Sequence, residues 1–152
     1  MIQRIQSLYL LAVAALMTTA IFTPLASFLA GVEEFELYAF ELKSAEQSFS
    51  TMYMGIVVAL SAIIPLITIF MYKKRLLQIR LCAVEIVMLL GSIAFMAIYY
   101  YLSNRMFSGM EFSAQSFRIA IVFPLVSLIL VYMAARAIFK DEMLVRSLDR
   151  IR

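Results

Sequence analysis

Four long runs of apolar residues constrain this chain more than any other feature of its sequence. They cover residues 5–30, 52–72, 79–102 and 118–139, and the segments between them are short. Each run meets or exceeds the ~20 residues that an α-helix needs to cross ~30 Å of hydrocarbon. Because lipid offers the backbone no hydrogen-bond partners, such runs are expected to be helices. The sequence therefore predicts an all-α integral membrane protein, a single four-transmembrane-helix bundle over residues 1–152.

The composition agrees with a membrane protein and argues against several kinds of chemistry. Of the 152 residues, 64% are hydrophobic, against roughly 45–50% in soluble domains. The chain has no histidine and one cysteine, Cys82, which leaves no ligand set for zinc, haem or an iron–sulfur cluster. We therefore expect no metal and no cofactor. No nucleophile motif or pair of aspartates is present, so we expect no catalytic residues and no enzyme activity.

Lys and Arg are distributed unevenly around the four runs, and this predicts an orientation. Cations gather at the N-terminus, in residues 73–80 and in the tail, residues 140–152, whereas most acidic residues lie in the other two segments. By the positive-inside rule, both termini are expected in the cytoplasm. The net charge of +3 is then a basic rim that faces anionic lipid, and we expect no binding of nucleic acid.

Proline residues fall in three of the four runs, at Pro24, Pro65 and Pro124. Inside a helix, proline removes one backbone hydrogen bond and usually kinks the axis. Isolated prolines are more frequent in membrane helices than in soluble ones, so we interpret all three as kinks. The alternative is that broken helices form a transport site near the middle of the membrane.

Glu85 is expected about one turn inside the third membrane span, where a carboxylate should face protein or water and have a partner. Because the third and fourth helices run in opposite directions, Arg136 is expected at a similar depth, roughly 6–8 Å from the cytoplasmic edge. We interpret Glu85 and Arg136 as a structural ion pair. The alternative is a proton or ion relay, although no further titratable residue lies between Ile86 and Tyr100. Arg118 is expected to reach the lipid headgroups or an outer-loop glutamate.

The two outer segments are too short for an independent domain, and a small β-hairpin or sheet above the bundle is our hypothesis for them. The stretch EEFELYAFELK, residues 33–43, alternates acidic with aromatic or aliphatic residues in places, which favours a strand. MFSGMEFS, residues 106–113, contains a glycine-centred turn and is expected to pair with it. Phe35, Tyr38 and Phe40 are interpreted as interfacial anchors, with contact to a partner as the alternative.

The tail, residues 140–152, is rich in charge, unlike the rest of the chain. Leu144, Leu148 and Ile151 recur at i, i+4 and i+7, which predicts an amphipathic helix. Its charges have both signs, whereas helices that bind lipid surfaces favour Lys and Arg alone on the polar face. We therefore expect the cytoplasmic ends to dock on another protein, through Arg4, Asp141, Glu142, Arg146, Asp149 and Arg150.

The two ends also carry a resemblance. MIQRIQSLYLL at the start and RAIFKDEMLVRSLDRIR at the end resemble the ends of a Bacteroidota family of small four-helix membrane proteins of unknown function. The similarity in spacing and hydropathy extends over the whole chain. It implies a location in the bacterial inner membrane, and it brings no activity, substrate or catalytic residue.

Three functions are compatible with these patterns. The leading hypothesis is a non-enzymatic subunit or scaffold of a larger inner-membrane assembly in envelope biogenesis or secretion, with other integral membrane proteins as partners. The alternative is a small transporter or channel that uses Glu85, Arg136 and the proline-kinked helices. An intramembrane enzyme is a remote third hypothesis. A polar cavity that reaches past Glu85 toward the outside would favour transport, and a dry bundle would favour the scaffold.

Overall fold

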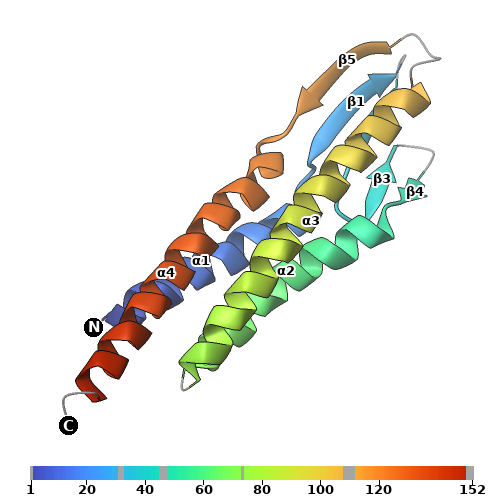
Figure 1. Cartoon of the computed structure of the whole chain (residues 1–152). Coiled ribbons are helices and arrows are strands. Elements are labelled where there is room, and N and C mark those ends of the chain that lie inside the picture. The colour runs from blue at the N-terminus through green and yellow to red at the C-terminus, as the bar shows by residue number, and fades with distance from the viewer. Residues whose placement is uncertain (1, 31–32, 45–47, 73, 108–111, 150–152) are drawn as a thin grey trace.

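The computed structural model describes residues 2–30, 33–44, 48–72, 74–107 and 112–149 (Figure 1). In these ranges the chain forms long helices and one small antiparallel sheet. The helices are α1 (Ile2–Phe22), α2 (Met52–Phe70), α3 (Arg75–Phe107), the 3-10 helix η1 (Ile119–Val122) and α4 (Phe123–Asp149). The strands are β1 (Ala26–Ala30), β2 (Glu33–Leu37), β3 (Glu41–Lys43), β4 (Ser48–Ser50) and β5 (Phe112–Phe117).

The four long helices pack as a bundle in which α1 and α3 each contact both α2 and α4. Leu10, Met17, Leu89 and Val131 are among the side chains buried at its centre. On the outside, many large apolar side chains are exposed, such as Val87, which is 65% exposed. All four helices are long and apolar enough to cross a membrane. The fold is therefore compatible with a multi-pass membrane protein whose outer apolar surface faces lipid.

Helix α1 is shorter than the apolar run that predicts it. It ends at Phe22, and residues 26–30 form strand β1 instead of further helix. Pro24 explains the change, because proline disfavours helical backbone at the residue before it and has no N–H to donate. The N–H of Leu25 then donates to the carbonyl of Leu37 at 2.7 Å, which begins the pairing of β1 with β2.

The other two prolines also differ in their roles. Pro65 lies inside α2, where the prediction of a proline within a helix is correct. Pro124 is the second residue of α4, after η1 has ended. Proline is well tolerated in the first turn of a helix, since the N–H it lacks would have no intrahelical partner there. Pro24 therefore follows the end of α1, and Pro124 lies in the first turn of α4, so the predicted kinks inside a helix are not found at these two positions.

The sheet has five strands in the order β4-β3-β2-β1-β5, with every neighbouring pair antiparallel. Of the two hypotheses for these segments, a hairpin or a small sheet, the sheet is confirmed, and the fold is mostly helical with this sheet beside the bundle. EEFELYAFELK forms two strands, β2 and β3, joined by a tight turn in which Tyr38 N–H donates to the Glu41 carbonyl at 2.7 Å. Phe112 and Ser113 belong to β5, which pairs with β1 and not with residues 33–43, so that predicted pairing is wrong for these two residues. Residues 26–30, which form β1, were expected to be helical.

The sheet lies against the end of α3 (Figure 1). Tyr100 of α3 packs on Phe28 of β1 and on Phe117 of β5, with ring centroids 5.3 Å and 4.7 Å apart. The 33 residues of α3 extend for about 50 Å, well beyond the ~30 Å of a hydrocarbon core. The length of α3 thus allows one helix both to cross a membrane and to support the sheet outside it.

Helix α4 continues without a break into the tail. It runs as one helix from Phe123 to Asp149, so residues 140–149 are helical, as the apolar spacing predicts. Residues 150–152 lie outside the described residues. At the start, η1 joins Arg118 to α4. The tail is therefore the last part of a membrane-sized helix and extends in the same direction.

Candidate functional site

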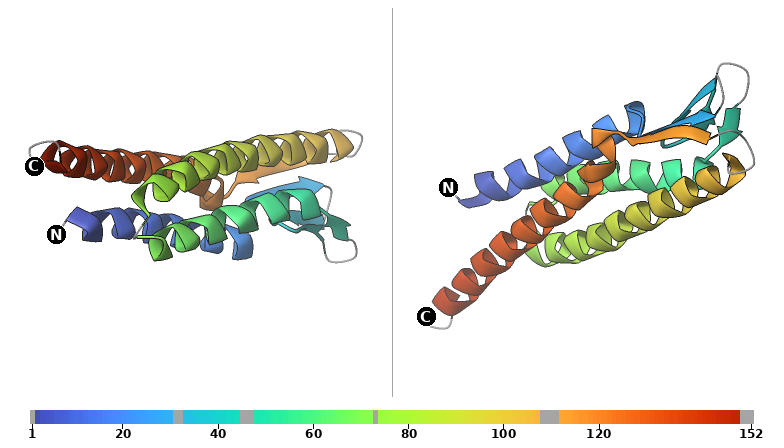
Figure 2. Two further views of the ribbon diagram at one scale, coloured as in Figure 1. Left: turned by 60° about the horizontal axis from the view of Figure 1, so that its bottom comes forward. Right: turned by 90° about the horizontal axis from the view of Figure 1, so that it is seen from above.

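Three helices meet at the end of the bundle that lies opposite the sheet. Asp141 of α4 accepts a hydrogen bond from Gln6 Nε2 of α1 at 3.1 Å on its carboxylate. Arg75 of α3 donates from Nη1 to the backbone carbonyl of Asp141 at 3.4 Å. Figure 2 shows the N- and C-terminal ends of the chain at this same end of the bundle. We name the contact among Gln6, Arg75 and Asp141 the charged junction.

The predicted docking residues are only partly described by the structure. Asp141 and Glu142 are half-buried, whereas the side chains of Arg4, Arg146 and Asp149, and Arg150 as a whole, lie outside the described residues. Docking through these residues therefore stays a prediction. What the structure adds is an apolar surface next to the charged residues, because Met143, Leu144 and Val145 are 53%, 49% and 41% exposed.

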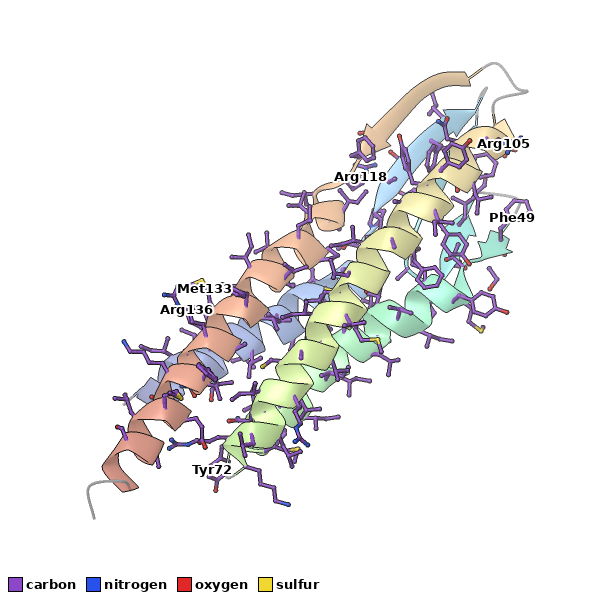
Figure 3. All side chains as sticks on the ribbon, viewed as in Figure 1. Phe49, Tyr72, Arg105, Arg118, Met133 and Arg136 are labelled. Carbon is purple, nitrogen blue, oxygen red and sulfur yellow. The ribbon has the colours of Figure 1, made fainter. Side chains whose placement is uncertain are left out.

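Glu85 lies in the interior of the bundle. Its side chain is 1% exposed, and neither carboxylate oxygen has a hydrogen-bond partner among the described residues. The expected partner, Arg136, is exposed, and Figure 3 places it beside Met133 on the side of α4 turned away from α3. The predicted ion pair between Glu85 and Arg136 is thus not formed in the structure.

The rotation of α4 explains why the two residues do not meet. The buried residues of α4 recur at Ser127, Val131, Ala134 and Ile138, which is the spacing of one helix face. Arg136 follows Ala134 by two positions, or about 200° around the helix axis. The expected similar depth of Glu85 and Arg136 in the membrane does not fix which way either side chain points.

Buried polar side chains form a column through the interior of the bundle. Gln78, Glu85 and Ser92 follow one another at intervals of seven and share one face of α3. Gln78 Nε2 donates to the carbonyl of Thr68 on α2 at 3.0 Å, and the hydroxyl of Ser92 lies 3.4 Å from that of Ser61 on α2. We name Gln78, Glu85 and Ser92 of α3, together with Thr68 and Ser61 of α2, the polar column. The spacing of seven was present in the sequence, but the partners on α2 were not deducible from it.

At the other end, Arg118 connects the strands of the sheet. Its guanidinium Nη2 lies 3.5 Å from Glu34 Oε1 and 3.7 Å from Glu36 Oε1, and both glutamates belong to β2. The backbone N–H of Arg118 also donates to the carbonyl of Leu25 at 3.1 Å. Of the two expectations for Arg118, contact with an outer-loop glutamate is therefore confirmed.

The predicted aromatic contact residues separate into different environments. Phe35 is 6% exposed and belongs to the core, so it does not offer a surface to a partner. Tyr38 is half-buried, and its hydroxyl donates to Glu36 Oε2 at 2.8 Å. Phe40 is 41% exposed and lies over Gly55 of α2. Phe35 is buried because successive side chains of a strand point to opposite faces of the sheet, and Phe35 in β2 points to the core face.

Two apolar pockets lie beside α3 near the sheet. One, of about 420 Å³, is bordered by β4 and the end of α3 and includes Phe49 and Arg105. The other, of about 590 Å³, lies between α3 and the segment from β5 to α4 and includes Met96 and Phe117. Neither of these two pockets includes Glu85.

Residues 2–151 match the protein family described as a domain of unknown function, DUF4293. The chain belongs to the DUF4293 family. The match includes both ends on which the resemblance was based, and a family of unknown function is what the resemblance led us to expect. No curated protein has a significant similarity to the chain. The bacterial phylum and the inner-membrane location stay predictions for this DUF4293 protein.

Proposed function

We propose that this DUF4293 protein is a non-enzymatic subunit or scaffold of a larger assembly in the bacterial inner membrane. The observation that carries the proposal is the end of α4, which extends past the charged junction and exposes Met143, Leu144 and Val145. Both termini lie in the cytoplasm, and the sheet lies on the outer side, in keeping with the distribution of Lys and Arg.

The end of α4 is suited to neither of the two solvents that surround a membrane protein. Residues 140–149 carry Lys140, Asp141 and Glu142 within one turn, and burial of such charges in hydrocarbon is costly. The neighbouring apolar side chains of Met143, Leu144 and Val145, in contrast, are more stable when another surface packs on them than when they contact water. In Figure 2 this end of α4 diverges from α1 and extends beyond it. A partner protein with a complementary surface satisfies both requirements.

A lipid surface fits this segment less well than a protein does. Helices that lie on membranes adopt an in-plane orientation and carry mainly Lys and Arg on the polar face. Here the segment continues the axis of α4 as one helix, and acidic residues stand beside the basic ones. We therefore assign the end of α4 to docking on an integral membrane protein or its cytoplasmic domain, in an assembly for envelope biogenesis or secretion in Bacteroidota.

The proposal is tested by affinity purification of the tagged protein from its native membranes in a gentle detergent, followed by mass spectrometry. We expect a large membrane protein to be recovered in stoichiometric amounts. The double variant L144S/V145S is expected to lose that partner, because it removes the exposed apolar side chains. L76S is the matched control, since Leu76 is 52% exposed on α3 at the same end of the bundle.

Charge reversal at Arg146 and Arg150 extends this test to the predicted docking charges. Loss of the partner in this variant, with the monodisperse elution of the wild-type protein retained, would support docking through the tail. Recovery of the partner at the wild-type level in both tail variants would contradict it. Purification of the wild-type protein alone, as a monomer or a homo-oligomer, would contradict the subunit proposal itself.

A second candidate function, a small transporter or channel, is favoured by one observation, the polar column inside the bundle. Gln78, Glu85 and Ser92 line up along α3, and Pro65 lies at the facing helix α2. Intramembrane carboxyls often belong to proton and ion pathways. Reconstituted vesicles would show ion or proton flux in the wild-type protein and reduced flux in E85Q if this function were correct.

A further inference from the structure

Glu85 is isolated among the charged residues of this protein. It is the one acidic or basic side chain that is buried among the residues that the structure describes. It follows Arg75, the first residue of α3, by ten positions, which places it about 15 Å along the helix from the charged junction. The carboxyl therefore lies well inside the apolar part of the bundle.

The side chains packed around this position supply no positive charge. On α3, the buried neighbours one turn away are Cys82 and Leu89. The buried residues that α2 contributes to this half of the bundle are Ala62, Pro65 and Thr68, and those of α4 are Val131, Ala134 and Ile138. None of these six residues is titratable.

The remaining titratable groups on the facing helices do not neutralise Glu85 either. Tyr9 of α1 is half-buried, and a phenol cannot supply a positive charge. Tyr132 and Arg136 of α4 are exposed on the outer side. Arg75 is engaged with Asp141 at the charged junction. An ionised carboxylate at position 85 would thus be buried without an opposite charge and without a hydrogen-bond donor, which is its least favourable state.

Within the polar column, the carboxyl of Glu85 lies nearer to the charged junction than to the sheet end of α3. Gln78, 8% exposed, lies two helical turns from Glu85 in the direction of the charged junction and bonds to Thr68 of α2. In the other direction, the buried polar residues of α3 are Ser92 and Ser103, and α3 continues from Glu85 to Phe107, more than twice the distance back to Arg75. The route from Glu85 through Gln78 to the charged junction is therefore the shorter one.

We propose that Glu85 is a proton-binding site inside the bundle, whose carboxyl takes up and releases a proton through the end at which Gln78 and Asp141 lie. The site goes beyond a role as scaffold and does not rest on it, since docking through α4 and protonation of Glu85 involve different residues. Its ligand is the proton itself, because the neighbouring side chains supply neither the oxygen ligands for a metal cation nor a counter-ion.

A hydrophobic carbodiimide tests the proposal in the purified, full-length protein in detergent. Dicyclohexylcarbodiimide takes up the proton of a carboxylic acid and adds to its oxygen, and the adduct rearranges to a stable acylurea in which no atom is lost. We expect one adduct per chain, found by peptide mass spectrometry at Glu85. The rate of labelling should fall as the pH is raised, because the reaction consumes the protonated acid.

Three variants define the site and its route, and one reagent defines its environment. E85Q should lose the adduct, whereas E41Q, which changes an exposed carboxyl of β3, should be labelled like the wild-type protein. Q78L should slow the loss of reactivity that follows a jump to alkaline pH. A water-soluble carbodiimide with an added amine should leave Glu85 unmodified, because that reagent reaches carboxylates in water.

Three outcomes would overturn the proposal. The first is a folded wild-type protein that dicyclohexylcarbodiimide does not modify at Glu85. The second is equal reactivity with the water-soluble reagent, which would show that the carboxyl is in contact with water. The third is an unchanged response of Q78L to the pH jump, which would remove the route through Gln78. Mapping the adduct in the wild-type protein keeps the first two readouts independent of how well E85Q folds.

Discussion

Single side chains at the sheet end of the bundle decide how closely the strands and helices approach one another. Gly55 of α2 lies directly under the ring of Phe40, and a Cβ atom at this position would overlap that ring. Gly91 of α3 is different, because the nearest atom to an added Cβ is Val57 Cγ1 at 3.7 Å, an ordinary contact. The two glycines therefore make a matched pair that separates packing from backbone effects.

We predict that G55A destabilises the protein by roughly 1–3 kcal/mol, the usual cost of overpacking. G91A should have little effect or stabilise by up to about 1 kcal/mol, since alanine is a better helix former than glycine. Thermal or denaturant unfolding of the detergent-solubilised variants measures both. The double variant F40A/G55A should recover much of the loss. If G55A and G91A had equal effects, contact with Phe40 would not be the reason for glycine at position 55.

Tyr38 provides a prediction about pH on the outer side of the bundle. Its hydrogen bond to Glu36 raises the pKa of Tyr38 above its ordinary value of 10.0, with burial and the charges of Glu36 and Glu41 as further causes. Because the folded protein holds the phenolic proton more tightly than the unfolded chain, the stability from this group is complete below pH ~10. It is lost as the pH rises from there through the pKa of the folded state.

The measurement is the tyrosinate absorbance of the wild-type protein minus that of Y38F, followed through an alkaline titration. We expect the isolated Tyr38 signal to titrate above the ordinary value and to move downward in E36Q. Y38F should also lack this part of the alkaline loss of stability. A difference titration that is identical in E36Q would show that Glu36 does not control Tyr38.

At the scale of elements, Arg118 joins the end of β5 to β2 across β1, the strand that lies between them. The side chain of Arg118 is 46% exposed, and those of Glu34 and Glu36 are 54% and 33% exposed. Ion pairs with this much exposure are screened by water and contribute little, typically up to ~1 kcal/mol. The backbone ladder of the sheet and the packing of Phe28 and Phe117 on Tyr100 are then the main sources of its stability.

We predict that R118Q lowers the free energy of unfolding by no more than about 1 kcal/mol at low salt. The difference from the wild-type protein should shrink at high salt, because mobile ions already screen the exposed pair. Unfolding at two salt concentrations provides the measurement, and E34Q should show a smaller effect of the same kind. A loss of several kcal/mol that salt does not alter would mean that Arg118 supports the sheet by packing rather than by charge.

At the scale of the whole molecule, the fold places the sheet and the two termini at opposite ends of the helices (Figure 1). The proposed orientation therefore predicts that the two ends differ in access to reagents. Cys82, the single cysteine, is 1% exposed and should not react with a membrane-impermeant maleimide in intact cells. This makes the natural chain a suitable background for added cysteines.

We predict that S48C, in β4, reacts with the impermeant maleimide in cells whose inner membrane is intact and whose outer layer admits the reagent. S147C, near the end of α4, should react only after the inner membrane is opened. Gel shift or mass spectrometry of the labelled protein measures both. The reverse pattern would invert the proposed orientation, and labelling of both positions in intact cells would contradict a membrane between them.

The sequence by itself determined the features that depend on contact with solvent and on local backbone chemistry. The four apolar runs were sufficient to predict four membrane-sized helices, and the spacing of Leu144 and Leu148 was sufficient to predict that residues 140–149 are helical. The alternation of acidic with aromatic or aliphatic residues in residues 33–43 was sufficient to predict strand structure there. It did not predict the number or the order of the strands. Pro24 carried the signal for the end of α1, but hydropathy alone does not separate an apolar strand from the last turns of an apolar helix.

Only the tertiary structure decided which side chains meet. Arg136 was expected at the depth of Glu85, but packing of α4 on α3 turned Ala134 and Ile138 inward and left Arg136 outside. Strand β5 paired with β1, since antiparallel strands distant in sequence are brought together by the helices that hold them. Both results depend on how helices rotate and pack against one another. That rotation is set by contacts between elements, which no periodicity within a single element records.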